Sequence, residues 1–461
     1  MHKLHALLLS AFLILAVGGV QAADRMPDRA VIMISVDGLA QYYLDDPNAQ
    51  MPTIRQLAAE GARARMMKAS VPTVTWPNHT TLVTGVQPAR HGVVGNNYFD
   101  RVTGKVVTLI TDPIYDKEQI VKSPTIYDLA KANGLSTAAV IWPATRNART
   151  LDWTVPDVAT DELFQKYGTP ALLAECKAAG IDYSRYGEWN KAGRYDLRDQ
   201  LNTRIFNLIL ETHRPNLALL HLINVDHIEH LKGPQTPEAY AAVKEADQRV
   251  REVWDEARKV YPGKASIVIV SDHGFFPIRQ AILPNVILHQ AGLLDVKGPR
   301  IVSAQIWAVS QGGCAFIYVL DDAHRDALID RAAGLFKDVE GVDVVLKPAD
   351  FARYGVATPK QDPHMPDVIL FARSGYSFGD TSAGQLAVTT KSAEVRGTHG
   401  HDPNQPGMHA TFVAWGAGVK AGAKLGVISN ADVAPTVAAL LGFTMKDVDG
   451  KVLDDALEQR R

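Results

Sequence analysis

The sequence predicts an α/β protein in which a mostly parallel sheet is covered by helices on both faces. Short, continuously apolar runs rich in β-branched residues recur along the 461 residues, and helical patterns separate these runs. Strands that are apolar on both faces are typical of a buried parallel sheet, whereas strands with one face in water alternate between apolar and polar residues. The alternation of such strands with helices indicates repeated βαβ connections.

The expected strands are AVIMISV at 30–36, STAAVIW at 136–142, LALLHLINV at 217–225, ASIVIVS at 265–271, DVILFA at 367–372 and ATFVAW at 410–415. The expected helices span residues 52–60, 124–133, 198–212, 237–260, 322–337 and 431–441.

The chain from residue 275 to residue 395 has an organisation of its own. It contains the strand–helix–strand pattern CAFIYVL, DDAHRDALIDRAAGLF and VDVVLK, followed by a glycine- and serine-rich stretch near 374–384. We therefore expect residues 275–395 to form an inserted cap or side subdomain. The catalytic core is then expected to comprise residues 23–274 and 396–461.

The N-terminus has the pattern of an export signal. A lysine at position 3 precedes an apolar run that ends in the small residues of VQAA. This pattern predicts a signal peptide over residues 1–22, cleaved after Ala22 or Ala23, and a periplasmic or secreted protein. An uncleaved anchor is the alternative, but the run is short for a bilayer span, and no later segment is apolar enough to form one.

The charge balance argues against a polyanionic partner. With 48 basic and 50 acidic residues the formal net charge is -2, so no overall field recruits nucleic acid or an anionic membrane. An anionic ligand must be captured locally.

The two cysteines, Cys176 and Cys314, form no Cys-x-x-Cys pattern and are expected to be single buried thiols, although their spacing leaves a disulfide open. The oligomeric state is not indicated.

Three apolar strands lead into aspartates: Asp37 in VIMISVDG, Asp226 in LINVDHIEH and Asp272 in SIVIVSDHG. In open α/β sheets, ligands bind outside the carboxyl ends of the strands, so these three carboxylates are expected to converge. Any one of them alone would be interpreted as a turn or helix-cap residue.

Histidines accompany these aspartates at useful spacings. His230 lies four residues after Asp226, His273 follows Asp272 directly, and His399 stands in the glycine-rich RGTHGHDPN. Imidazole together with carboxylate suits Zn²⁺ or a similar transition metal, whereas Mg²⁺ and Ca²⁺ prefer oxygen alone. Six such side chains are accounted for better by two metal ions than by one.

The segment ASVPTVTWPNHTTLVTG, residues 69–85, places Thr75 two residues before Pro77. Because proline is favoured in the first turn of a helix, a helix is expected to begin near Trp76 or Pro77. Thr75 then lies at or beside the helix start, where free N–H groups and the helix dipole attract an anion such as phosphate. A simple capping role for Thr75 is the alternative.

Together these motifs resemble the alkaline phosphatase superfamily and, within it, the type I phosphodiesterase/nucleotide pyrophosphatase family. The resemblance runs from about residue 30 to residue 443 and rests on VDG, PTVTWPNHTTLVTG, HGVVGNN, WPAT, DHIEH, SDHG and GTHGHD. It implies an alkaline-phosphatase-like core and a hydrolase of phosphodiesters or phosphoanhydrides, with a small-molecule phosphodiester or nucleotide as substrate.

The resemblance also implies the roles of individual residues. It implies one zinc ion held by Asp226, His230 and His399, and a second held by Asp37, Asp272, His273 and Thr75. Thr75 would be the nucleophile of a double displacement that passes through a phosphothreonine. Asn96 matches the family's position for a side-chain amide that donates to a phosphoryl oxygen.

Two alternatives to this activity stay open, and a third is disfavoured. A phosphomonoesterase of the same superfamily would need extra positive charge near the nucleophile, and Arg146 and Arg149 follow IWPAT, although no Lys-x-Arg pair is present. A sulfatase is disfavoured because the nucleophile segment lacks the required Cys or Ser. A non-catalytic periplasmic metal-binding protein would have no need for Thr75 or Asn96.

The leaving group is not defined by the sequence. Trp76 follows the expected nucleophile and is a candidate for binding the substrate. For Tyr98 and Phe99, stacking on a base and a place in the core are both open. Asp402 is a candidate for orienting a ligand histidine. His79 and His91 are expected to have structural roles, and His227, His364 and His401 match no ligand position.

Overall fold

The computed structural model describes residues 28–110, 115–390 and 394–459. The predicted signal peptide lies outside these residues. No helix within the described ranges has the length and apolar character needed to cross a bilayer.

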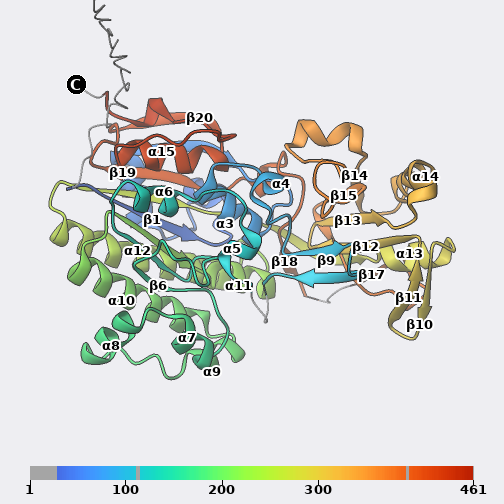
Figure 1. The fold of residues 1–461 in the computed structure, drawn as a ribbon, viewed down its shortest axis with the longest axis horizontal. Helices are drawn as coiled ribbons and strands as arrows, with labels where there is room; N and C mark the ends of the chain where they lie inside the picture. The colour runs from blue at the N-terminus through green and yellow to red at the C-terminus, as the bar shows by residue number, and fades with distance from the viewer. Residues whose placement is uncertain (1–27, 111–114, 391–393, 460–461) are drawn as a thin grey trace, which may run out of the picture.

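An eight-stranded sheet forms the centre of the molecule, with strand order β20-β2-β19-β8-β1-β7-β5-β6. Its members are β1 (Ala30–Val36), β2 (Ala62–Lys68), β5 (Thr137–Val140), β6 (Trp153–Val155), β7 (Leu217–Leu222), β8 (Ala265–Val270), β19 (Phe412–Gly416) and β20 (Ala423–Ser429). Strands β8, β1, β7, β5 and β6 run parallel, and β19 is antiparallel to both of its neighbours. The predicted fold class is confirmed, since the large sheet is mostly parallel and has helices on both faces (Figure 1).

Each face of this sheet has its own hydrophobic core and its own helices. One core lies beneath α2 (Pro52–Glu60), α8 (Pro170–Ala178), α10 (Tyr195–His213) and α12 (Pro237–Val260). The other lies beneath α3 (Thr75–Thr84), α6 (Ile126–Ala132) and α15 (Val433–Leu440).

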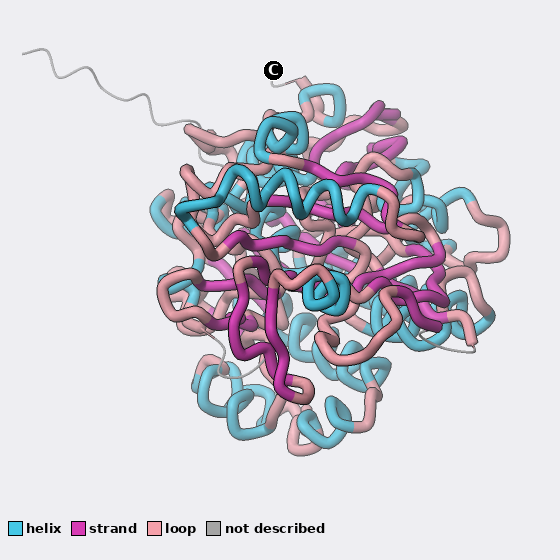
Figure 2. The backbone as a smooth tube through the Cα atoms, turned by 90° about the vertical axis from the view of Figure 1, so that its right-hand side faces the viewer, coloured by secondary structure: helices cyan, strands magenta, loops and turns pink. Residues whose placement is uncertain are grey.

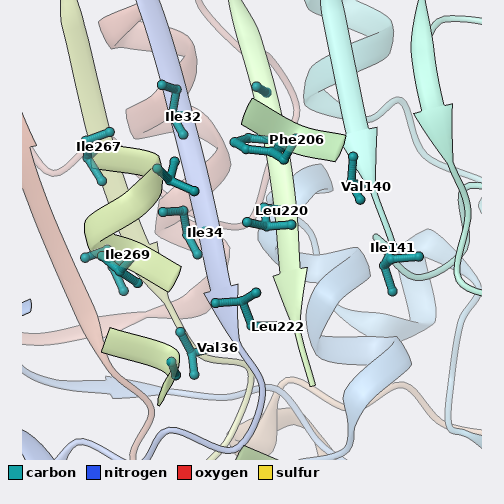
Figure 3. Packing of buried hydrophobic residues seen from close by; sticks show 14 of the residues in the cluster. Ile32, Ile34, Val36, Val140, Ile141, Phe206, Leu220, Leu222, Ile267 and Ile269 are labelled. Carbon is teal, nitrogen blue, oxygen red and sulfur yellow. The ribbon is translucent and has the colours of Figure 1, made fainter. Parts of the chain in front are cut away.

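Alternate residues of the central strands enter opposite cores because side chains of a strand alternate between its faces. In β1, Ile32 and Ile34 pack into the first core, close to Phe206 of α10 (Figure 3), and Met33 packs into the second. Each fully buried side chain of this size contributes about 1.5–3 kcal/mol to folding. The continuous apolar runs that predicted these strands therefore reflect burial on both faces.

The region from residue 276 to residue 398, here called the lateral region, forms sheets separate from the central one (Figure 1). One sheet has the order β12-β13-β15-β14; another has β16-β9-β17, with β18 also paired to β9; and β10 pairs with β11. Figure 2 views the molecule from the side of this region.

The strands of the lateral region are β9 (Phe276–Ile282), β10 (Leu294–Lys297), β11 (Arg300–Ala304), β12 (Ile306–Gln311), β13 (Cys314–Val319), β14 (Val342–Leu346), β15 (Val368–Ala372), β16 (Gly375–Phe378), β17 (Val388–Thr390) and β18 (Arg396–Thr398). Its helices are α13 (Pro284–Gln290) and α14 (Arg325–Lys337). The expected strand at 367–372 is present as β15, but it belongs to this antiparallel sheet and not to the central parallel one.

The remaining elements connect these units. The hairpin strands β3 (Asn97–Asp100) and β4 (Lys105–Thr108) pair with each other, and the short helices are α1 (Tyr42–Asp45), α4 (Pro88–His91), α5 (Lys117–Ile120), α7 (Asp161–Tyr167), α9 (Tyr186–Lys191) and α11 (Asn224–Lys232). Short 3₁₀ helices span Asp322–His324, Pro348–Tyr354, Pro406–Met408, Asn430–Asp432 and Asp454–Ala456. Cys176 and Cys314 are free and buried, as expected.

Candidate active site

The three strand-end aspartates lie at neighbouring strand ends. Asp37 directly follows β1, Asp272 follows β8 after one serine, and Asp226 lies in the first turn of α11, which begins just after β7. Because β1 pairs in parallel with both β7 and β8, these three ends are adjacent at one edge of the sheet. The structure therefore places the carboxylates together, as parallel topology requires.

Two overlapping groups of side chains present possible metal ligands. The ligand atoms of Asp37, Asp272 and His273 lie within 4.8 Å of one another, and the same holds for Asp226, His273 and His399. The rings of His273 and His399 are stacked with centroids 3.7 Å apart. His273 thus stands between the two carboxylate groups and links them into one cluster.

His230 joins this cluster from the exposed side. Its Nε2 is 3.4 Å from Asp226 Oδ1, and its side chain is 38% exposed. Its Nδ1 hydrogen-bonds with the carbonyl oxygen of Gly397 (3.1 Å), and Nδ1 of His399 hydrogen-bonds with the carbonyl oxygen of Thr73 (3.0 Å). Both rings are therefore held at Nδ1 by backbone oxygen and present Nε2 toward Asp226, which is the usual arrangement of histidine ligands.

The unsatisfied polar atoms of the cluster fit metal ions. Among the described residues, Asp37 Oδ1, Asp226 Oδ1, Asp272 Oδ2 and His273 Nε2 are buried and form no hydrogen bond of good geometry, although Asp272 Oδ2 and His273 Nε2 lie 3.0 Å apart. Buried polar groups without partners are costly, and in native proteins such groups are satisfied by a partner that is a protein group, water or an ion. A mixed carboxylate and imidazole donor set suits zinc.

The electrostatics of the cluster also favour bound cations. Burial raises the pKa of Asp37 well above its usual range, and the nearby charges of Asp272 and Asp226 raise it further. Burial lowers the pKa of His399 well below its usual range, with His273 contributing, so its ring is neutral and able to act as a ligand. Carboxylates this close together in a buried site need positive charge between them.

Thr75 lies at the first residue of α3 and is half-buried. The N-cap of this helix is Val74, so the hydroxyl of Thr75 is not used as a helix cap. The preceding residues connect it to the cluster, because the Thr73 carbonyl oxygen contacts His399. A second connection runs through His79. Its Nδ1 donates to the Thr75 carbonyl oxygen (2.9 Å), and the same Nδ1 lies 3.5 Å from Asp272 Oδ2.

Asn96 is fixed beside this helix start. Its Oδ1 accepts a hydrogen bond from the backbone N–H of Trp76 (3.1 Å), the residue after Thr75. With Oδ1 engaged in this way, the amide nitrogen forms the other end of the side chain and is available as a donor. The structure thus brings the two predicted catalytic residues, Thr75 and Asn96, to the same helix terminus.

The expected substrate-binding role of the Trp76 side chain is wrong. Trp76 is 3% exposed and packs in the hydrophobic core, so its indole has no free face on which a ligand can stack. Phe99 is likewise buried, against Trp307 and Tyr318. Tyr98 is half-buried beside His364.

Asp402 does not orient a ligand histidine, contrary to expectation. Its carboxylate accepts from the Tyr354 hydroxyl (3.1 Å) and from the backbone and side chain of Asn404 (2.9 and 2.8 Å). The structural interpretation of His91 is supported by its contacts with Thr81 Oγ1 (3.0 Å) and with the backbone N–H of Val93 (3.2 Å).

His79 is also fully buried, and its Nε2 hydrogen-bonds with Ser35 Oγ (2.8 Å). Burial, with His221 contributing, lowers the pKa of His79 to about 3. It is therefore a neutral residue that packs behind the cluster.

Sequence reasoning missed His221, a single histidine in the apolar strand β7. Its Nε2 hydrogen-bonds with Asp37 Oδ2 (2.9 Å), and its Nδ1 hydrogen-bonds with the carbonyl oxygen of Ile141 (3.0 Å). Ile141 has φ 58°, a conformation that costs a β-branched residue about 1–2 kcal/mol. The signal available in the sequence was a histidine between leucines in a fully buried strand.

His221→Phe is expected to weaken zinc binding about 10- to 100-fold, because nothing then holds Asp37 Oδ2 so that Oδ1 faces the cluster. Competition with a chromogenic chelator measures this affinity. His91→Phe is the matched control, since it removes a buried histidine that hydrogen-bonds away from the cluster. Wild-type affinity in His221→Phe would contradict the expectation.

This fold and site define a metal-dependent hydrolase of the α/β class, with a cluster of carboxylates and imidazoles beside the start of a helix. Residues 31–402 match the family described as Type I phosphodiesterase / nucleotide pyrophosphatase. The chain therefore belongs to this family, as its motifs predicted, and is a phosphodiester hydrolase.

Individual relatives are distant but extend over most of the chain. An uncharacterized pyrophosphatase/phosphodiesterase of Schizosaccharomyces pombe is 25% identical, covering 94% of this chain and 80% of the relative. Ectonucleotide pyrophosphatase/phosphodiesterase family member 7 of Rattus norvegicus is 23% identical, covering 93% and 86%.

Solved structures show the same fold. Murine ectonucleotide pyrophosphatase/phosphodiesterase 5 superimposes with a TM-score of 0.70 at 18% identity, covering 93% of this chain and all of that one. An inactive threonine-to-alanine variant of the murine protein, in complex with AMP, gives the same score.

Proposed function

We propose that this protein is a two-zinc phosphodiesterase/nucleotide pyrophosphatase that cleaves its substrate through a phosphothreonine at Thr75. The observation that carries the proposal is the position of Thr75 as the first residue of α3, in contact through its flanking backbone with residues of the aspartate and histidine cluster. Asp226, His230 and His399 would hold one ion, and Asp37, Asp272, His273 and Thr75 the other.

The roles of the protein groups follow from their placement. Bound zinc would lower the pKa of the Thr75 hydroxyl and neutralise charge on the phosphoryl group. The Thr75 oxygen attacks phosphorus in line and the first ester or anhydride oxygen leaves. The Asn96 amide and the start of α3 receive the non-bridging oxygens. Attack by water then frees the phosphorylated product and restores the threonine hydroxyl.

The environment of Arg146 favours a diester over a monoester substrate. Arg146 was the cation that could have matched the second negative charge of a monoester. Its Nε instead donates to Asp116 Oδ1 (2.6 Å), and its guanidinium lies over the ring of Tyr167, 4.9 Å from the centroid. A cation already paired with a carboxylate is poorly suited to compensate a dianionic phosphoryl group.

The substrate class is proposed to be a nucleotide or another small phosphodiester, which is the chemistry named for the relatives. Cleavage of a signal peptide at residues 1–22 and export to the periplasm or medium fit the ecto- prefix of those names. Residues 275–395, which make up most of the lateral region, are proposed to form a subdomain inserted into the catalytic core.

A direct comparison of substrates tests this proposal. The kcat/KM for bis-p-nitrophenyl phosphate is expected to exceed that for p-nitrophenyl phosphate by about a hundredfold, equivalent to about 2.7 kcal/mol of transition-state binding. Arg146→Ala is expected to leave this ratio within about threefold, because the Asp116 pair already engages the guanidinium.

Two results would contradict the proposed phosphodiesterase activity. A monoester preference that Arg146→Ala removes would replace the proposal with a phosphomonoesterase. Absence of turnover of either ester by protein that retains its zinc would support the non-catalytic metal-binding alternative.

A further inference from the structure

The turn between β12 and β13 reaches from the lateral region to the histidine loop of the active site. The backbone N–H of Gly313 donates to the carbonyl oxygen of His399 (2.7 Å). Gly312 has φ 75°, and a Cβ built on Gly400 would lie 2.0 Å from the carbonyl oxygen of Gln311. The two loops therefore touch at the level of the backbone, and glycine is required for that approach.

The side chain of Gln311, at the start of this turn, holds the segment that contains Asn96. Its Oε1 accepts from the backbone N–H of Asn96 (3.1 Å), and its Nε2 donates to the carbonyl oxygen of Asn97. Gln311 is 4% exposed, so water does not compete strongly for these bonds. A glutamine amide provides the acceptor and the donor that this pair of backbone groups needs.

These contacts continue to the proposed nucleophile. Asn96 Oδ1 accepts from the N–H of Trp76, and Trp76 follows Thr75 directly. Gln311 thus fixes the backbone of a residue whose side chain is in turn fixed against the start of α3. A rotation of the Asn96 backbone would turn its amide away from that helix start.

A second contact joins the lateral region to the same hairpin. Arg101, between β3 and β4, donates to Asp367 Oδ2 (2.7 Å), and Asp367 is fully buried. The hairpin begins directly after Asn96. Residues of the lateral region therefore hold it both at the start of its first strand and at its turn.

We propose that Gln311 is a positioning residue for phosphoryl transfer, acting through Asn96, so that the lateral region completes the active site. This inference rests on the phosphoryl-binding role proposed for Asn96. The effect of Gln311 must then depend on the presence of the Asn96 side chain, whereas a purely structural role would not depend on it.

A double-mutant cycle with Gln311→Met and Asn96→Ala tests the inference. Gln311→Met keeps the length of the side chain and removes both hydrogen bonds. It is expected to lower kcat for bis-p-nitrophenyl phosphate about 10- to 100-fold, with a smaller change in KM and unchanged zinc content. In the Asn96→Ala background the same substitution is expected to change kcat by less than about twofold.

A second variant and a matched control protect the test from folding defects. Gln311→Glu keeps the acceptor for the Asn96 N–H but faces the Asn97 carbonyl oxygen with a carboxylate, and it is expected to be impaired as well. Gln290→Met removes a glutamine hydrogen bond to the Gln385 carbonyl oxygen on the exposed surface of the same region. It is expected to keep wild-type kcat.

Three results of this experiment would overturn the positioning role of Gln311. Equal losses on Gln311→Met in both backgrounds, or a kcat within about twofold of wild type for Gln311→Met and Gln311→Glu, would overturn the positioning role while leaving the proposed function intact. If Asn96→Ala alone has full activity, the role of Asn96 itself is wrong, and the positioning role fails with it.

Discussion

Replacing Thr75 with alanine is expected to lower kcat/KM for bis-p-nitrophenyl phosphate by about a thousandfold or more while leaving most of the bound zinc in place. The reason is that the substitution removes the oxygen proposed to attack phosphorus but leaves the six proposed aspartate and histidine ligands unchanged. Steady-state kinetics on protein of measured zinc content provides the comparison.

Two further variants define what the loss means. Thr75→Ser keeps a hydroxyl at the helix start and is expected to retain measurable turnover and a trappable phosphoserine. Thr84→Ala is the control for a threonine in the same helix, since its hydroxyl donates to the Thr80 carbonyl oxygen (2.8 Å) and accepts from the Val86 N–H (3.4 Å). If Thr75→Ala keeps more than about a tenth of the wild-type rate, attack by this side chain is ruled out.

Removing the metal is expected to abolish turnover and to lower the melting temperature. Elemental analysis should find close to two equivalents of zinc, and dialysis against a chelator should remove both the zinc and the activity, which added zinc restores. Stability falls because Asp37, Asp226 and Asp272 then face one another without a cation. A ligand at 100 times its Kd contributes about 2.7 kcal/mol to folding.

Asp272→Asn is expected to bind fewer than two equivalents of zinc and to lose most of its turnover. Asp247→Asn is the matched control: Asp247 is also buried, but its carboxylate accepts from the N–H groups of Thr53 and Ile54 in α2. The control should reduce stability without changing zinc content. An active wild-type preparation with one equivalent of zinc or none would refute the two-metal assignment.

The central strands were predictable because they consist of consecutive buried, mostly apolar residues. The run at 30–36 is buried at every position and matches β1 to the residue, and the helices at 52–60 and 237–260 match α2 and α12. Convergence of Asp37 and Asp272 followed from parallel topology alone, since neighbouring parallel strands end at the same edge.

Strand β20, at the edge of the central sheet, and its neighbour β2 were missed for a physical reason. In β2, which has the sequence ARARMMK, only some residues are buried, and two arginines interrupt the apolar pattern. β20 lies at the edge of the sheet and contains several exposed positions. Strands covered on fewer sides need fewer apolar residues, so they give a weaker signal.

The errors at the site arose where tertiary contacts decide a role. Whether an aromatic ring beside a nucleophile faces a ligand or the core depends on what packs against it, and the ring of Trp76 packs in the core. The functions of His221 and Gln311 depend on contacts with Asp37 and Asn96, distant residues that no local pattern connects to them.

The wide spacing of the ligands along the chain has a consequence for how the protein is made. Asp37 lies near the beginning of the described chain, His399 lies near its end, and β19, which pairs with β8 beside Asp272, comes later still. Contacts of such high sequence separation form slowly, because long loops must close before any contact offsets their entropy. A growing polypeptide on the ribosome therefore carries an incomplete cluster of aspartates and histidines until His399 has been synthesised.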